Sequence, residues 1–205
     1  MRGPVTIAVT GPFASGKSTL VRLLEELPNT ETASADETVH HLLKNDPETI
    51  SRIVQRFGEG VRGPDGIDRK ALGREVFKDA GALRDLEEIL HPLVRVETDR
   101  RIEGSEAEVF VVEIPLLFET GRGGDFDYTV AVTVPEKRRR EWSRERGVDD
   151  AALEAIEARQ YVGEEKARRA DLVVQNDGDL DRLREQAESI GRKVLQEGGS
   201  YGHLR

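Results

Sequence analysis

The chain has 205 residues, which is enough for one compact domain with insertions and a substantial buried core. Its 31 basic and 40 acidic side chains give a formal net charge of −9, which argues against general nucleic-acid binding because that needs a basic surface. The chain contains no cysteine, so disulfides and thiolate metal sites are excluded. No stretch approaches the ~20 apolar residues of a membrane span, and no apolar segment of signal-peptide type opens the sequence. We therefore expect a cytoplasmic protein, a monomer or weak oligomer, that binds neither nucleic acid nor membrane.

Short segments rich in β-branched residues are the candidate strands. Four of them are near-continuous apolar runs, at 5–10, 109–114, 128–134 and 171–176, and a weaker fifth lies at 31–36. Such runs are typical of strands that are covered on both faces. Helical patterns lie between them; four leucines from Leu20 to Leu27 recur at helical spacing, and Pro28 closes that segment. This alternation predicts an α/β fold built on a parallel sheet.

Two helical stretches interrupt the alternation. Residues 37–107 are almost wholly helical in pattern, with a turn at 63–66. This segment is too long for one crossover helix. Residues 136–166 have the pattern of two charged helices around Gly147. We expect the first stretch to form a helical subdomain and the second a helical flap.

Residues 11–19 read GPFASGKST and fit the Walker A pattern, in which two glycines bracket four residues before Lys17 and Ser18. Glycine lets successive N–H groups turn inward as an anion nest, and the helix that follows adds its positive end. Lys17 is expected to reach the β- and γ-phosphates and Ser18 to bind magnesium. We therefore predict an ATP-binding loop made of Gly11, Ala14, Ser15, Gly16, Lys17, Ser18 and Thr19. The alternative, a glycine-rich turn without function, is disfavoured by the strand before the loop and the amphipathic helix after it.

Asp36 ends the weakest candidate strand, which places it at the carboxyl edge of the sheet, where α/β folds bind ligands. A carboxylate there can take the proton of an alcohol that attacks the γ-phosphate. Aspartate is also a good N-cap for the helix that follows. Position alone does not choose between these two roles.

Six segments together resemble the dephospho-CoA kinase family. They are TGPFASGKST, ADETVHH, GIDRKALGREVF, ILHPLV, EIPLLFE and KARRADLVVQNDG, in this order over residues 5 to about 195. The resemblance implies a three-layer P-loop kinase fold with a five-stranded parallel sheet. It implies that 1–36, 108–135 and 167–198 form the nucleotide-binding core, 37–107 the helical acceptor-binding subdomain and 136–166 the lid. It also implies transfer of the γ-phosphate of ATP to the ribose 3′-hydroxyl of dephospho-CoA, with Mg²⁺.

The resemblance assigns acceptor-side roles to single residues. It makes Asp36 the general base, although this chain has Ser34 where the family usually has a first aspartate. His40 and Arg69 are expected to contact the acceptor, Arg69 through its pyrophosphate, which a guanidinium matches well. A surface or packed histidine and a structural salt bridge are the alternative roles of these two. Glu119 is also expected to contact the acceptor.

Two further groups are expected around the nucleotide. Glu113 follows an apolar run as a Walker B carboxylate does, and we expect it to hold magnesium through water together with Ser18. Asn176 and Gly178 end the last strand and are expected to offer amide contacts to adenine. A plain strand-to-helix turn explains both equally well.

Five arginines of the flap lie within ten residues, at positions 138, 139, 140, 144 and 146. A charge run is usually a solvated helix face, but a kinase lid needs cations over the transferring phosphoryl group. We expect Arg140 or Arg144, which share a helix face, to act in this way, with Arg146 as an alternative. By resemblance, Gln160 ends the lid.

Three features of the sequence remain outside these assignments. We expect the His91–Pro92 pair to shape a turn. Pro12 and Phe13 stand where the family more often has a glycine and a small aliphatic residue, and the sequence suggests no role for them. A nucleoside or nucleotide kinase on the same scaffold competes with the proposed activity, and so does a P-loop switch without an acceptor. The order of the motifs argues against the first, and the long helical subdomain argues against the second.

Overall fold

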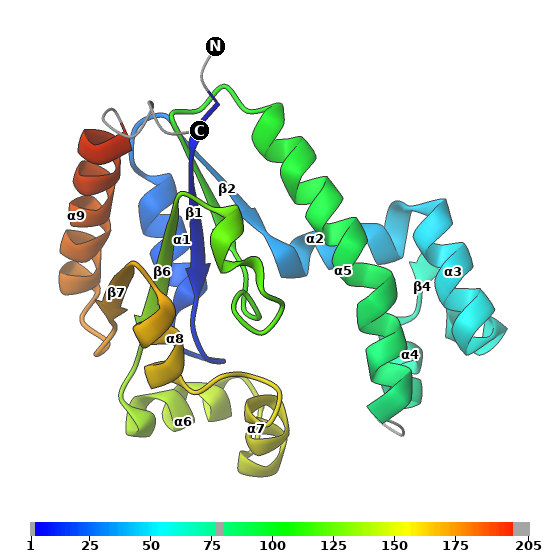
Figure 1. Cartoon of the computed structure of the whole chain (residues 1–205). Helices are drawn as coiled ribbons and strands as arrows, with labels where there is room; N and C mark the ends of the chain where they lie inside the picture. The colour runs from blue at the N-terminus through cyan, green and yellow to red at the C-terminus, as the bar shows by residue number, and fades with distance from the viewer. Residues whose placement is uncertain (1–2, 77–79, 199–205) are drawn as a thin grey trace. The chain divides into compact units, whose positions relative to one another are not determined.

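The computed structural model describes residues 3–76 and 80–198 and divides them into two units (Figure 1). Unit 1 contains the described residues up to Ala33 and from Ser105 onward, and unit 2 is Ser34–Gly104. Each unit has an apolar core of its own.

A five-stranded sheet forms the centre of unit 1. Its strands are β1 (Val5–Thr10), β2 (Thr30–Ser34), β5 (Val109–Glu113), β6 (Tyr128–Thr133) and β7 (Leu172–Gln175). They lie in the order β2-β5-β1-β6-β7, and β1 pairs in parallel with both β5 and β6. The α/β fold with a five-stranded parallel sheet is therefore confirmed. Four of the five strands lie within one residue of their predicted ends because their apolar, β-branched runs are unambiguous.

Helices cover both faces of this sheet (Figure 1). On one face, α1 (Lys17–Glu25) and α9 (Leu180–Gly198) pack on a core that includes Ile7 and Val9. Side chains alternate between the faces of a strand, so Thr10 lies on the face that Ile7 and Val9 do not share. There α8 (Gly163–Arg169) packs against β6 and reaches Thr10 through Lys166. The arrangement has three layers, as predicted.

The predicted flap contains α6 (Glu136–Glu145) and α7 (Asp150–Glu157), which flank Gly147 at a φ of 75°. A third helix, α8, follows them and was not predicted. Its pattern was present, because acidic residues occupy its first turn and basic residues its last, as the helix dipole favours. A short 3-10 turn, η2 (Arg122–Asp125), precedes β6.

Unit 2 is helical apart from one small hairpin. Its elements are α2 (Ala35–Asn45), α3 (Pro47–Phe57), η1 (Glu59–Val61), β3 (Arg62–Gly63), β4 (Gly66–Ile67), α4 (Arg69–Val76) and α5 (Ala80–Glu103). The β3–β4 hairpin is the turn predicted at 63–66. Leu43, Ile53, Val61 and Leu90 are among the buried residues that hold these elements together.

Two local predictions were wrong. The strand expected to reach residue 36 ends at Ser34, and Asp36 lies in the first turn of α2. The N-cap of α2 is Ser34, whose Oγ accepts a hydrogen bond from the N–H of Glu37, so Asp36 is not the cap. The expected turn at His91–Pro92 is also absent, because Pro92 lies inside α5. Pro92 is exposed, whereas Leu90 and Val94 are buried, so the backbone disruption at proline faces outward and the helix continues.

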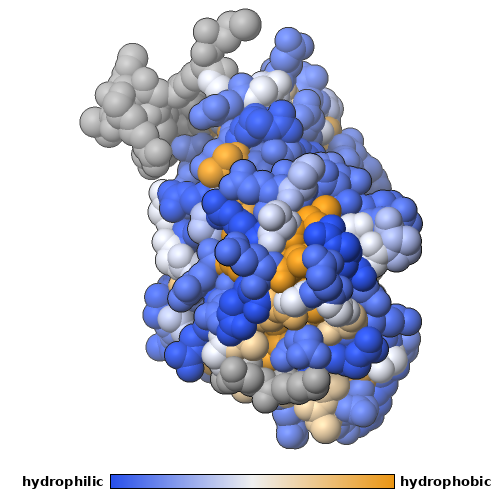
Figure 2. Space-filling view, turned by 90° about the vertical axis from the view of Figure 1, so that its right-hand side faces the viewer, coloured by the Kyte–Doolittle hydropathy of each residue, from blue (hydrophilic) through white to orange (hydrophobic). Residues whose placement is uncertain are grey.

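The surface agrees with the high content of charged residues. Hydrophilic side chains cover most of the face seen in Figure 2, and apolar residues show only in limited areas between them. Among the described residues, no helix combines the length and apolar character that crossing a membrane requires.

Candidate active site

The loop between β1 and α1 curves tightly at its glycines. A side chain on Gly11 would come within 2.6 Å of the Val132 carbonyl oxygen and 2.8 Å of Ser15 Oγ, so only glycine fits there. Gly16 and Ala14 have φ angles of 89° and 57°, which turn the backbone back on itself. The helix α1 starts next to this loop without a side-chain N-cap. Its first N–H groups and its positive end are therefore available to an anion.

Asn176 supports this loop from the end of β7. Its Nδ2 donates to the Ser15 carbonyl oxygen at 2.9 Å, and its Oδ1 accepts from the N–H of Gly178 at 3.2 Å. The residue is 5% exposed, and a side chain on Gly16 would overlap its amide group. The Asn176 amide thus shapes the loop, a role that sequence reasoning did not assign to it. The adenine contact of Asn176 and Gly178 stays a prediction.

Ser18 and Glu113 meet at the edge of the sheet. The Ser18 hydroxyl donates to Glu113 Oε1 at 3.1 Å, and the β1–β5 register places Glu113 opposite Val9, just before the loop. A hydroxyl and a carboxylate oxygen are ligands that a hard cation such as Mg²⁺ prefers. Lys17 lies close by and donates from Nζ to the Pro12 carbonyl oxygen at 3.0 Å. Within 3–76 and 80–198, no cluster of three or more His, Cys, Asp or Glu side chains is placed to hold a metal.

Arg140 and Arg144 lie on the same side of α6. Both reach Asp150 of α7, Arg140 Nη1 at 3.6 Å and Arg144 Nη2 at 2.8 Å. The hydrogen bond from Arg144 is the main cause that lowers the pKa of Asp150. Arg140 also donates to Glu136 at 2.7 Å. These ion pairs hold α6 and α7 together at exposed positions.

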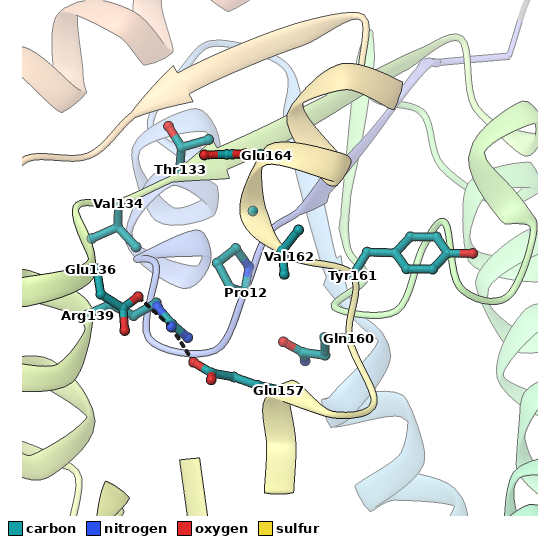
Figure 3. A pocket seen from close by; sticks show the side chains of 11 residues that line it. Pro12, Thr133, Val134, Glu136, Arg139, Glu157, Gln160, Tyr161, Val162 and Glu164 are labelled. Carbon is teal, nitrogen blue, oxygen red and sulfur yellow. Dashed lines mark hydrogen bonds and ion pairs between the residues drawn. The ribbon is translucent and has the colours of Figure 1, made fainter. Parts of the chain in front are cut away.

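Arg139 behaves differently from its neighbours because it is buried. It pairs with Glu136 at 2.7 Å and also with Glu157. Figure 3 shows these side chains at the rim of a pocket of about 500 Å³. Pro12 from the phosphate loop and Val162 from the segment before α8 also line it. The sequence could not single out Arg139 among five arginines, since helix phase alone does not reveal which one α7 covers.

Phe13 connects the loop to the flap. Its backbone N–H donates to Gln160 Oε1 at 3.1 Å, and the Arg146 guanidinium lies 5.9 Å from the centre of its ring. A cation over an aromatic face is attracted by the ring quadrupole. Phe13, for which the sequence suggested no role, therefore contacts the flap at two points, Gln160 and Arg146.

A fully buried lysine lies at the carboxyl ends of β1 and β5. Lys166 Nζ contacts Glu119 Oε1 at 2.7 Å and donates to the Pro115 carbonyl oxygen at 2.6 Å. Burial lowers the pKa of Lys166, and the bond to Glu119 opposes that shift. Glu119 was predicted to contact the acceptor. Lys166 was not predicted, because in the sequence it looks like one of many charges on α8.

The predicted acceptor residues Asp36, His40 and Arg69 belong to unit 2, and all three are exposed. Arg69 is the first residue of α4, which Asp68 caps through bonds from the N–H groups of residues 70 and 71. These bonds lower the pKa of Asp68. Arg69 itself has no ion pair with the described residues, so the alternative role of a structural salt bridge finds no partner there.

Comparisons with known proteins show the family to which this chain is similar. The family model described as dephospho-CoA kinase matches residues 5–182. A dephospho-CoA kinase of Symbiobacterium thermophilum is 42% identical over 96% of this chain and 83% of its own length. A crystal structure of a Thermus thermophilus protein superposes with a TM-score of 0.79 at 32% identity, over 94% of this chain and 98% of that one. A dephospho-CoA kinase from Campylobacter jejuni has the same fold, with a TM-score of 0.60 at 24% identity over 92% and 96% of the two chains. The chain therefore belongs to the dephospho-CoA kinase family.

Proposed function

We propose that this chain transfers the γ-phosphate of ATP to the ribose 3′-hydroxyl of dephospho-CoA and releases ADP and coenzyme A. One observation carries the proposal. A phosphate loop with a hydroxyl-to-carboxylate pair at Ser18 and Glu113 lies in a chain that matches the dephospho-CoA kinase family over residues 5–182. The following roles of single residues are part of the same proposal.

The donor side is the core of residues 1–36, 108–135 and 167–198. The N–H groups of the loop at Gly11 to Thr19 and the start of α1 hold the phosphates. Lys17 leaves the Pro12 carbonyl, which it now contacts at 3.0 Å, for the β- and γ-phosphates. Asn176 and Gly178 lie at the loop after β7 and offer contacts to adenine.

Ser18 and Glu113 hold Mg²⁺, Glu113 through a water molecule. Their 3.1 Å contact supports this assignment, since two oxygen groups of the kind that Mg²⁺ prefers already lie together. Few protein ligands are needed, because Mg²⁺ usually keeps several waters and binds the phosphates of the nucleotide. When bound, the ion neutralises charge on the phosphate oxygens.

The acceptor side is the helical subdomain of residues 37–107 together with Asp36. The oxygen of the 3′-hydroxyl attacks the γ-phosphorus, and the bond from that phosphorus to the bridging oxygen of ADP breaks. Asp36 takes the hydroxyl proton, a role that its exposed carboxylate in the first turn of α2 permits. His40, one turn further along α2, and Arg69 hold the rest of the acceptor.

The flap of residues 136–166 is the lid. Arg140 and Arg144 are its candidate cations, and their contacts with the same carboxylate, Asp150, support this choice. In the proposal they exchange this carboxylate for oxygens of the transferring phosphoryl group. Arg146 stacks over Phe13 and is the alternative cation.

An acceptor panel tests the proposed function. The protein is incubated with ATP and Mg²⁺, and ADP formation is compared with dephospho-CoA, nucleosides and nucleoside monophosphates as acceptors. We expect kcat/KM to be highest for dephospho-CoA. A higher kcat/KM for a nucleoside or a nucleotide would replace this function with the competing kinase activity, and ADP formation independent of acceptor would indicate a switch.

A further inference from the structure

The contacts of Lys166 account for its whole hydrogen-bonding capacity. An ammonium group has three N–H donors. They serve the Glu119 carboxylate, the Pro115 carbonyl oxygen and the Thr10 hydroxyl, the last at 3.4 Å. The Thr10 hydroxyl in turn donates to the same Pro115 carbonyl at 3.2 Å. Lys166 and Thr10 are fully buried, so this is a closed polar network and not a solvated ion pair.

The network joins the ends of β1 and β5, which carry the phosphate loop and Glu113 and are together called the catalytic edge here. Thr10 is the residue before Gly11, where the phosphate loop begins, and Pro115 lies two residues after Glu113. An adjacent bond from the N–H of Ile114 to the Val9 carbonyl, at 2.9 Å, also joins the two segments. Lys166 therefore fixes the spacing of the two segments that carry the phosphate loop and the Glu113 carboxylate.

Glu119 extends the network to the end of the lid. Its Oε1 accepts a bond from the backbone N–H of Tyr161 at 2.6 Å, while both of its oxygens contact Lys166. The preceding residue, Gln160, holds the N–H of Phe13 in the phosphate loop. The segment at which the lid returns to the core is thus tied to both parts of the catalytic edge.

We propose that Lys166 and Glu119 are a positioning pair that aligns the phosphate loop with Glu113 and anchors the lid, and that Glu119 acts through Lys166 without contacting the acceptor. The inference deepens the proposed function and rests on it. Both oxygens of Glu119 have partners within the protein, and its side chain is only 13% exposed. An acceptor contact would require Glu119 to break this network.

The test uses kinetics of the full chain with both substrates varied. The variants are Lys166→Met, which keeps length without charge, Glu119→Gln, which keeps shape and can still accept from Tyr161, and the double variant. A matched control is Glu188→Gln with Arg192→Met, an exposed ion pair on α9. Wild-type protein must form coenzyme A in the same assay; its failure would refute the proposed function and not the pair.

A positioning pair predicts a fall in kcat, because misalignment of reacting groups costs roughly ten- to hundredfold in rate. The KM for dephospho-CoA should stay within about twofold of wild type, since no acceptor contact is lost. The double variant should be no slower than the slower single variant, because both substitutions break one network. The control should keep wild-type kcat and KM.

Three results would overturn the inference. If Glu119→Gln raises the KM for dephospho-CoA about tenfold while Lys166→Met leaves it unchanged, Glu119 contacts the acceptor. If the two rate losses multiply in the double variant, the residues act separately. If all variants unfold at lower temperature but keep wild-type kcat and KM, the pair only stabilises the fold. Should Lys166→Met fail to fold, the kcat and KM of Glu119→Gln decide between positioning and acceptor contact.

Discussion

Substitution of Gly16 by alanine probes the packing of the phosphate loop. Gly16 has a φ of 89°, and an L-residue in the left-handed region costs about 1–2 kcal/mol relative to glycine. The new methyl group would also overlap the Asn176 amide, which must then give up its bond to the Ser15 carbonyl. A buried group left without its partner costs about 1–3 kcal/mol. We therefore expect Gly16→Ala to lower the free energy of unfolding by about 2–5 kcal/mol.

Gly121 offers a matched control. Its φ is 70°, and nothing lies within 4 Å of a side chain placed there. Gly121→Ala should therefore show only the conformational cost of about 1–2 kcal/mol. Asn176→Ala removes the overlapping group, so in that background Gly16→Ala should cost no more than the control.

Urea unfolding followed by the fluorescence of Trp142, the single tryptophan, measures these differences. Trp142 reports on this region because it lies beside Gly178, just after Asn176. A Gly16→Ala variant that is no more destabilised than Gly121→Ala would contradict the predicted overlap with the Asn176 amide. A cost of Gly16→Ala that is unchanged in the Asn176→Ala background would contradict it as well.

Four further predictions address the base, the phosphate loop, the lid and unit 2. Asp36→Asn should keep ATP binding near normal while lowering kcat by about 10²–10⁴-fold, which is the usual contribution of a general base. Turnover at the wild-type rate would show that Asp36 is not the base. Lys17→Ala should lower kcat/KM by about 10²-fold or more through lost charge on the phosphates, and full activity would contradict the phosphate loop. Phe13→Ala removes the ring beneath Arg146 and should speed tryptic cleavage within residues 137–146 by about two- to fivefold. This factor corresponds to the free energy of an exposed cation–π contact, and an unchanged cleavage rate would contradict the contact. Asp46 caps α3, and the bonds that it accepts from Thr49 lower the pKa of Asp46. The cap therefore stabilises the folded state fully above the unfolded pKa of Asp46, and this stabilisation is lost as pH falls through the lower folded pKa. Asp46→Ala should cost about 1 kcal/mol at pH 7 by urea unfolding, and its difference from wild type should shrink below about pH 4; a constant difference would contradict the cap.

The sheet and the phosphate loop could be predicted because their patterns are local. Buried parallel strands are continuous apolar runs, and Gly11, Gly16, Lys17 and Ser18 stand at a fixed spacing next to one of them. Ser18 and Glu113 were predicted as magnesium ligands from their own motifs, but the direct contact between them is visible only in the structure.

The features that were missed depend on contacts between distant segments. Lys166 and Arg139 look like surface charges in the sequence, and only the packing of α8 and α7 buries them. The role of Phe13 required Gln160, which lies 147 residues further along the chain. Asp36 was displaced from the strand because Ser34, which sequence reasoning treated as a minor departure, ends β2 and caps α2.

The central claim is that the γ-phosphate of ATP moves to the ribose 3′-hydroxyl of dephospho-CoA at this site. The most direct measurement follows labelled γ-phosphate from ATP into product and locates it by phosphorus NMR. The account predicts one labelled phosphate on the ribose 3′-oxygen for each ADP formed. Label released as inorganic phosphate, or found at another position of the acceptor, would contradict it.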